Sequence, residues 1–196
     1  MRSPTAINAV QRFDERIFRS LARSQGSWLD GPLSRVNSAS ERSKLSLGIA
    51  AVLALTGGAP GRRAATRGVA CLATSLVLTN GVLKPSVGRS RPDLGLLSRA
   101  RTIARRRGSA SFPSAHAAGS AGFATGVAVE LPWLGGPLGA LACAVGYSPI
   151  HMGMHHPLDV VGGWGLGAAV GLLSRRIVPG PAQPPPSQVA GQPGGW

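Results

Sequence analysis

Acidic residues are scarce in this sequence. Seven Asp and Glu stand against 21 Lys and Arg in 196 residues, which gives a formal net charge of +14. Magnesium-type centres need several carboxylates to hold the ion. Only Asp93 and Asp159 lie in the stretches Lys84–Pro113 and Tyr147–Asp159, where most other polar groups gather. The shortage therefore argues against a carboxylate-built metal site, and we expect no metal and no cofactor.

Cysteines and aromatic residues are also few. The two cysteines, Cys71 and Cys143, both lie in apolar stretches, which predicts small core residues and no disulfide. Aromatic residues make up 5% of the chain, and none interrupts the basic run RTIARRR at Arg101–Arg107. Without aromatics for base stacking, this run is not typical of a nucleic-acid surface. We expect no nucleic-acid partner.

The sequence has no unbroken apolar run of the about 20 residues that span a bilayer. It has instead five shorter apolar stretches of 12 to 17 residues, extended at most ends by Ser, Thr and Gly: Leu45–Thr56, Gly68–Leu83, Ala115–Leu131, Leu134–Ile150 and Leu158–Leu173. Each alone is compatible with a buried helix of a soluble bundle. Five in succession, separated by loops with nearly all the charge, predict an all-α, polytopic membrane bundle of about five transmembrane helices in residues 45–174. The many glycines and alanines favour close helix packing.

The ends of the chain differ from this core. Residues 1–44 lack the early apolar segment of a signal peptide, so membrane insertion is expected to use internal segments. An amphipathic helix on the membrane surface, followed by a linker, is predicted from apolar residues at helical spacing with arginines between them: Ile7, Val10, Phe13, Ile17, Phe18 and Leu21. The Pro/Gly-rich residues 175–196 are expected to be disordered.

Five spans would place the loops after the second and the fourth on one side of the membrane. The first of these contains KPSVGRSRPD, in which Lys84 and Arg91 flank a turn-prone segment. The planar fork of an arginine can pair two phosphate oxygens at once. The alternative is a basic loop that touches lipid headgroups.

The second polar cluster is SFPSAHAAGSAG, in which Pro113 and Ser114 stand where a helix should begin. Free backbone N–H groups at a helix start favour an anion. His116 would then lie within reach of that anion. A single interfacial histidine without a ligand is the alternative.

The third cluster is YSPIHMGMHHPLD, in which Pro157 marks a helix start. His155 precedes that start, and Asp159 is four residues further on, close enough to accept a hydrogen bond from one imidazole nitrogen. Such a bond fixes the tautomer and leaves the other nitrogen with an outward lone pair, as a nucleophile requires.

Zinc binding is the rival interpretation of these histidines. His151 and His155 are four residues apart, as two ligands on one helical turn would be, and His156 with Asp159 could complete the shell. A glycine and a proline within this stretch oppose a continuous helix there. We therefore expect chemistry that does not use a metal.

The three clusters together resemble the three-part signature of the type 2 phosphatidic acid phosphatase superfamily, membrane lipid phosphatases related to vanadium haloperoxidases. The matching patterns are Lys84-x6-Arg91-Pro92, Pro113-Ser114-x-His116 and Ser148-x6-His155-x3-Asp159, within about residues 45–174. The resemblance implies that His155 is a nucleophile that forms a phosphohistidine. It implies that Asp159 orients His155 and that His116 is the general acid. The implied phosphate-binding residues are Lys84, Arg91, Ser114 and, through its backbone amide, Ala115.

The sequence departs from the family pattern at Pro149, where an arginine that contacts phosphate normally follows the serine. Ala115, where glycine is usual, is a milder change. Losing a charge-assisted contact could cost about two decades in rate. Substitutes for the missing group include Arg89, one of Arg105–Arg107, and His151. Ser148, which opens the third pattern, is a further auxiliary candidate. Otherwise the protein is a weak or inactive, phosphatase-like phospholipid-binding membrane protein.

The expected substrate is a lipid-linked phosphomonoester or diphosphate of lipid or cell-wall metabolism, and anionic membrane lipids are expected partners. The Ala/Gly/Arg/Pro-rich usage favours a polyprenyl phosphate or a lipid such as decaprenylphosphoryl-5-phosphoribose phosphate. The expected location is the plasma membrane. Eight basic residues in 1–44 and eight in 84–113 indicate a cytoplasmic site, whereas many members of the family act on the outer face. The sequence predicts no oligomeric state.

Overall fold

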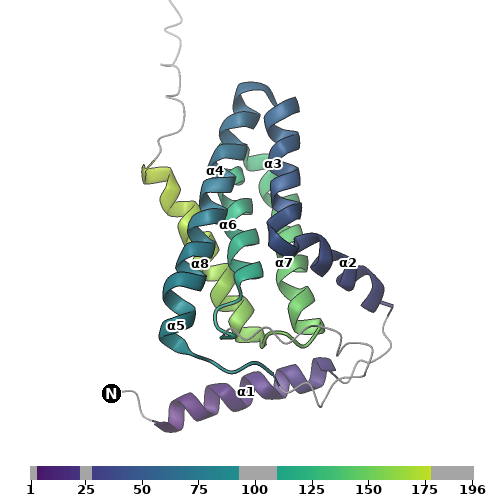
Figure 1. Ribbon diagram of the computed structural model, residues 1–196, viewed down its shortest axis with the longest axis vertical. Coiled ribbons are helices and arrows are strands. Elements are labelled where there is room, and N and C mark those ends of the chain that lie inside the picture. Colours follow the sequence, from purple (N-terminus) through teal and green to yellow (C-terminus); the bar gives the residue numbers. More distant parts are fainter. Residues whose placement is uncertain (1–3, 23–27, 93–109, 178–196) are drawn as a thin grey trace, which may run out of the picture.

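The computed structural model describes residues 4–22, 28–92 and 110–177, and every regular element in these ranges is helical (Figure 1). The α-helices are α1 (Pro4–Ala22), α2 (Asp30–Ser40), α3 (Lys44–Thr56), α4 (Gly58–Val77), α5 (Lys84–Val87), α6 (Ala115–Glu130), α7 (Gly135–His151) and α8 (Pro157–Ile177). Two short 3₁₀ segments, η1 (Glu41–Ser43) and η4 (Pro132–Leu134), and one π-helical segment, η2 (Leu78–Leu83), complete the set.

Five of these helices, α3, α4, α6, α7 and α8, form an upright bundle (Figure 1). Small and apolar residues are buried all around α6, which packs against α4, α7 and α8 and is therefore the central helix. The amphipathic helix α1 lies across one end of the bundle, where α5 ends and where α6 and α8 begin. The predicted all-α bundle and the predicted N-terminal helix are confirmed.

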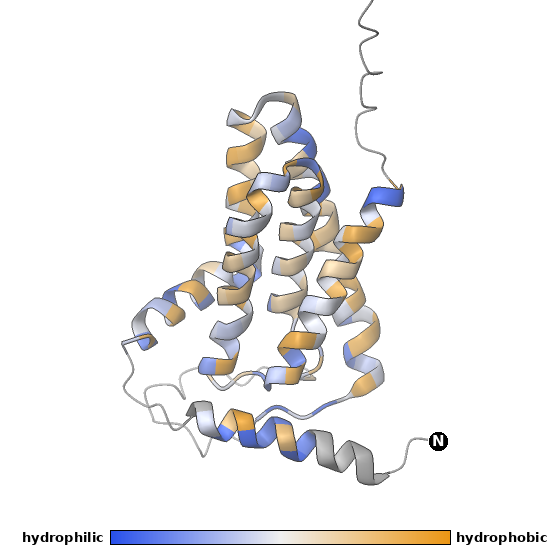
Figure 2. Cartoon of the chain, turned by 180° about the vertical axis from the view of Figure 1, so that it is seen from behind, coloured by the Kyte–Doolittle hydropathy of each residue, from blue (hydrophilic) through white to orange (hydrophobic). Residues whose placement is uncertain are grey.

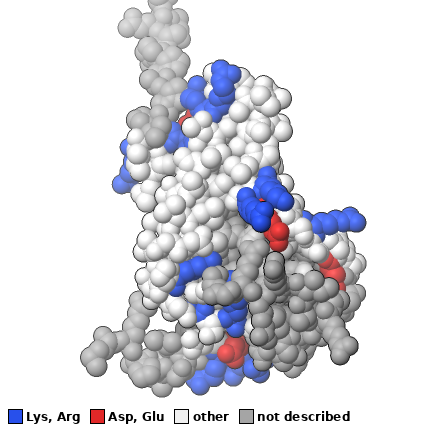
Figure 3. Space-filling view, in the orientation of Figure 1, with Lys and Arg blue, Asp and Glu red and all other residues white. Residues whose placement is uncertain are grey.

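The outer surface of the bundle is apolar. Its exposed large side chains include Val52, Leu55, Val77, Leu172 and Ile177, and apolar residues colour much of the long helices in Figure 2. On the face shown in Figure 3, basic residues gather near the two ends and at mid-height where α2 meets α3, with uncharged surface between these groups. Two helical segments, Gly58–Val87 and Pro157–Ile177, are long and apolar enough to cross a membrane. Helices α3, α6 and α7 are shorter, at 13, 16 and 17 residues.

The largest boundary error concerns α4, which begins at Gly58 and not at Gly68. The predicted span began only after Arg67, because a charged residue ends an apolar stretch. Arg67 is nevertheless inside the bundle, with a side chain only 5% exposed. It pairs with Glu130 of α6 at 2.7 Å and donates to the Ser174 carbonyl of α8 at 2.7 Å. A buried charge is tolerated because it is paired and hydrogen-bonded.

Two further predicted boundaries were wrong. Helix α2 lies within the predicted linker of residues 1–44, where mixed polar residues hid it. Helix α8 continues to Ile177, so the predicted tail loses its first three residues to a helix. The rest of that tail, 178–196, lies outside the described residues.

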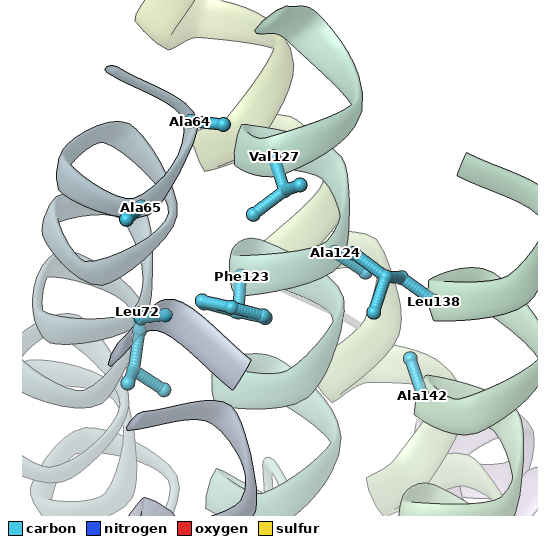
Figure 4. Packing of buried hydrophobic residues seen from close by; sticks show 9 residues of the cluster. Ala64, Ala65, Leu72, Phe123, Ala124, Val127, Leu138 and Ala142 are labelled. Carbon is cyan, nitrogen blue, oxygen red and sulfur yellow. The ribbon is translucent and has the colours of Figure 1, made fainter. Parts of the chain in front are cut away.

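A cluster of small and branched side chains forms the main core between α4, α6 and α7 (Figure 4). Its centre is Phe123 with Leu72, Val127, Leu138 and neighbouring alanines. Both cysteines are free thiols, and Cys71 is buried as predicted. Cys143 is exposed, so its assignment to the core was wrong: it lies on the outward side of α7, where the apolar pattern reflects the outer surface and not the core.

Glycines bring α8 into close contact with α6. Gly163, Gly167 and Gly171 are four residues apart and therefore lie on one face of α8. A Cβ added at Gly163 would lie 2.6 Å from the Ser114 carbonyl oxygen and 2.8 Å from the Ala117 Cβ. The close packing predicted from the glycine content is confirmed at this interface.

We expect Gly163→Ala to lower the free energy of unfolding by about 1–3 kcal/mol, because the new methyl group meets backbone that cannot move away easily. Thermal or denaturant unfolding in detergent would measure the change. Gly165→Ala is the matched control, because a Cβ there meets nothing within 4 Å and alanine favours helix. Equal destabilisation by both variants would contradict the packing argument.

Candidate active site

A cavity of about 300 Å³ is lined by residues from several elements, among them the start of α6 and the turn before α8. All three predicted polar clusters contribute to its wall, with Lys84 and Arg91 from the first, Ala115 and His116 from the second, and His155 from the third. The described parts of the loops after the second and the fourth predicted spans therefore meet at one end of the bundle. Five spans predicted that both loops would lie on the same side.

His155 lies in the turn between α7 and α8 and is only 4% exposed. Its Nδ1 faces the Asp159 carboxylate at 3.5 Å and the Ser111 hydroxyl at 3.5 Å. Both contacts are longer than an ordinary hydrogen bond. They leave Nε2 at the opposite edge of a ring that lines the cavity. Burial lowers the pKa of His155, against the opposing effect of Asp159, which favours a neutral imidazole.

Asp159 lies in the first turn of α8, as the position of Pro157 predicted, and it is fully buried. Its carboxylate accepts hydrogen bonds from the Ser111 hydroxyl, from the His156 backbone N–H at 2.9 Å and from Arg89 at 2.7 Å. So many donors fix the carboxylate firmly. Sequence reasoning missed Ser111, although it begins the second cluster and its hydroxyl was an available donor.

Arg89 bridges two buried carboxylates and does not line the cavity. Besides Asp159, it pairs with Asp14 of α1 at 2.5 Å. Asp14 is fully buried and also accepts from the Leu158 backbone N–H at 3.0 Å, at the start of α8. Sequence reasoning missed Asp14; the available signal was its place one helical turn before Phe18, on the face that α1 buries.

The second cluster is tied to the third through the backbone. Ser114 caps α6 by accepting from the Ala117 N–H at 3.5 Å, which confirms the predicted cap. The Ser114 N–H donates to the Asp159 carbonyl at 2.8 Å. Ser114 itself is fully buried, and Ala115 and His116 of the same helix start reach the cavity wall.

The cations of the first cluster are held by the chain around them. Lys84 follows the π-helical η2 and donates to the Asn80 amide oxygen at 3.0 Å. Such π-helical turns occur often at functional sites. Arg91 donates to the Met154 carbonyl at 2.7 Å, next to His155. The sequence predicted a loop from Lys84 onward, but α5 continues the helix to Val87.

The three auxiliary candidates do not line the cavity. Ser148 is buried and donates to the Val145 carbonyl at 3.1 Å, and the neighbouring Pro149 is buried within α7. His151 pairs with Asp30 of α2 at 2.5 Å, and Arg89 binds the carboxylates described above. Arg105–Arg107 and Asp93 lie outside the described residues. None of the described candidates thus lines the cavity in place of the missing arginine.

The geometry gives the zinc interpretation no set of ligands. His151 ends α7 and faces α2, whereas His155 and His156 face Asp159 across the turn that follows. Within residues 4–22, 28–92 and 110–177, no group of three or more His, Cys, Asp and Glu side chains is arranged to hold a metal ion.

Comparison with known proteins places this arrangement in a family context. The sequence profile of the PAP2 superfamily matches residues 65–181. Among solved structures, the chain is similar to the crystal structure of a transmembrane PAP2-type phosphatidylglycerolphosphate phosphatase from Bacillus subtilis. The TM-score is 0.64 at 25% identity, over 87% of this chain and 86% of that one. No curated protein sequence matches the chain.

Proposed function

The chain belongs to the PAP2 superfamily and is thereby a membrane phosphoric ester hydrolase, and we propose that it hydrolyses a lipid-linked phosphomonoester or diphosphate through a phosphohistidine at His155. One observation carries the proposal: His155, His116, Lys84 and Arg91 line one cavity at the end of the bundle. The buried Asp159 behind His155 completes the arrangement.

In the first step, neutral His155 attacks phosphorus through Nε2. The N–P bond forms as the bond from phosphorus to the leaving oxygen breaks, and His116 donates a proton to that oxygen. Lys84, Arg91 and the backbone N–H groups at the start of α6 stabilise charge on the other phosphoryl oxygens. Positioning and electrostatic stabilisation supply most of the catalysis in phosphoryl transfer.

In the second step, His116 takes a proton from a water molecule, and the water oxygen attacks phosphorus. The N–P bond breaks, inorganic phosphate leaves and His155 returns to its neutral form. Asp159 accepts a hydrogen bond from Nδ1 throughout and stabilises the ring while it carries the phosphoryl group. Because Lys84 and Arg91 supply the positive charge, the proposed reaction uses no metal ion.

The proposal is tested with purified protein in detergent. We expect release of inorganic phosphate from phosphatidic acid or polyprenyl diphosphate, unchanged by EDTA. Loss of activity in EDTA that one divalent ion restores would refute the metal-free mechanism. The alternative, a phospholipid-binding protein without turnover, rests on Pro149 in place of an arginine; binding of these lipids without phosphate release would favour it.

The pH dependence should report the state of His155. Burial lowers the pKa of its imidazole, so the ring stays neutral as the pH falls through the ordinary histidine pKa of about 6.5. We therefore expect the acid limb of kcat/KM to have its midpoint below pH 6.5, with activity lost only under more acidic conditions. A midpoint above that value would contradict the assignment of the buried His155 as the nucleophile.

We further propose a multi-pass protein of the plasma membrane, whose basic ends attract anionic lipids. The apolar outer surface and the basic residues at both ends support this placement (Figure 3). A polyprenyl-linked substrate remains our preferred one, on composition alone.

A further inference from the structure

We propose that Arg42, together with the hydroxyl groups of Ser43 and Ser46, forms a second anion-binding subsite in the cavity. This subsite would bind the phosphodiester of a lipid headgroup while the phosphomonoester of the same headgroup meets His155. The inference rests on the proposed function and extends it to a substrate class: lipids whose headgroup carries two phosphates separated by a short polar linker.

Arg42 comes from a part of the chain outside the family-matched region. It lies in η1, where α2 turns into α3 (Figure 1), and it lines the same cavity as Lys84, Arg91 and His155. Ser43 and Ser46 lie beside it on the same wall. His155 is buried whereas Arg42 is exposed, so Arg42 belongs to the rim of the cavity and not to its depth.

The polar groups of this wall are not used by the protein itself. Among the described residues, Arg42 has no carboxylate partner, and the hydroxyl groups of Ser43 and Ser46 have no hydrogen-bond partner. In the same chain, Arg67 and Arg89 are both paired with carboxylates. An arginine at a cavity rim with all its donors available fits a phosphate group from outside.

The backbone of η1 is unusual in a way that fits a binding role. Arg42 has φ 53° and Ser43 has φ 60°, so two consecutive residues other than glycine are left-handed. Residues rarely adopt this conformation without a compensating role, and such outliers cluster at ligand sites. Here the conformation turns the chain between α2 and α3 and keeps both residues on the cavity wall.

Charge balance suggests what the subsite takes. A phosphomonoester carries a charge of about −1.5 to −2 at neutral pH, which Lys84 and Arg91 can balance. A third cation on the wall matches a further single negative charge, which is that of a phosphodiester. The cavity of about 300 Å³ is at the small end of ligand pockets, so it accepts the headgroup and leaves the lipid tails outside.

The test measures binding without turnover, in a His155→Ala background. The two probes are short-chain lipids in detergent: dioctanoyl phosphatidylglycerol phosphate, with two phosphates, and dioctanoyl phosphatidic acid, with one. We expect Arg42→Asn to raise the Kd for the two-phosphate lipid by about tenfold or more, the loss expected for one charge-assisted contact. The Kd for phosphatidic acid should change less than about twofold, and Arg42→Lys should lie between the two.

Asparagine suits this test because it tolerates the left-handed conformation, so the variant should unfold at a temperature equal to or above that of the parent. Arg35→Asn is the matched control, since Arg35 is exposed on α2 and does not line the cavity. Equal weakening for both lipids would place Arg42 on the transferred phosphoryl group and refute the second subsite. No weakening for either lipid would also refute it. Because the assay needs no catalysis, a wild-type protein that releases no phosphate would overturn the proposed function and leave this result readable.

Discussion

His155→Ala is expected to abolish phosphatase turnover, with a loss in kcat of about 10⁴-fold or more, as when a nucleophile is removed from other enzymes that form covalent intermediates. The reason is specific to this ring. In the described structure it alone combines a place on the cavity wall with an Nδ1 directed at the buried Asp159. Phosphate release from a lipid substrate in detergent measures the effect.

The neighbouring His156 supplies the matched control. It is also buried, but it does not line the cavity, and its ring packs edge-on against the Phe18 ring of α1 with 5.8 Å between the centroids. Its Nδ1 lies 3.7 Å from the Asp159 carboxylate and has no hydrogen-bond partner among the described residues. His156→Ala keeps the backbone N–H that binds Asp159. We expect it to lower stability through lost packing while kcat stays within about tenfold. Equal loss of turnover from both variants would count against His155 as the nucleophile.

Arg89→Gln is expected to lower the free energy of unfolding by about 3–5 kcal/mol, the cost of breaking a buried ion pair from one side. The Arg89 side chain is 15% exposed, and the two carboxylates it bridges are fully buried. Without the guanidinium, Asp14 and Asp159 become two buried negative charges with no cation between them. Denaturant unfolding in detergent would give the change directly.

A double variant separates this electrostatic effect from lost packing. Asp14→Asn added to Arg89→Gln removes one of the stranded charges, so it should recover part of the lost stability. Arg19→Gln on α1 is the control, because its pair with Glu15 is exposed on both sides and should contribute less than about 1 kcal/mol. If the double variant were less stable than Arg89→Gln alone, the charge argument would fail.

Arg89 should act on catalysis as a positioning residue. It touches the carboxylate behind His155 and not the cavity, so Arg89→Gln should reduce kcat more than it raises KM. The acid limb of the pH profile should also move, because the Asp159 carboxylate that faces His155 Nδ1 would have lost its Arg89 partner. A change confined to KM would instead place Arg89 on the substrate.

The helix starts and the motif positions could be predicted from the sequence because their determinants are local. Pro157 and Asp159 lie in the first turn of α8, and Ser114 directly precedes α6 and caps it, so each signal is next to the helix start that it marks. The helix count then placed the loops at one end of the bundle. These two steps were enough to bring Lys84, Arg91, His116 and His155 to a common cavity.

The missed residues depend on pairings that local patterns do not encode. Asp14 lies 75 positions before Arg89 and reaches it only because α1 crosses the end of the bundle. In the sequence, Asp14 is a single polar residue on the otherwise apolar face of an amphipathic helix, and nothing nearby in the chain marks its partner. In the sequence, Arg42 was only one of the basic residues of the predicted linker. The turn between α2 and α3 brings it to the cavity, but no proline or glycine in the sequence indicates a turn there. The start of α4 was missed because Arg67 is paired across three helices.

The placement of α1 has a consequence for how far the catalytic unit extends along the chain. A protein shortened to the family-matched residues 65–181 would keep all three signature motifs and appear complete in a sequence comparison. It would nevertheless lose Asp14, whose carboxylate pairs with Arg89 and accepts a hydrogen bond from the Leu158 N–H at the start of α8. Expression trials and functional swaps between relatives should therefore treat the N-terminal helix as part of the enzyme and not as a dispensable leader.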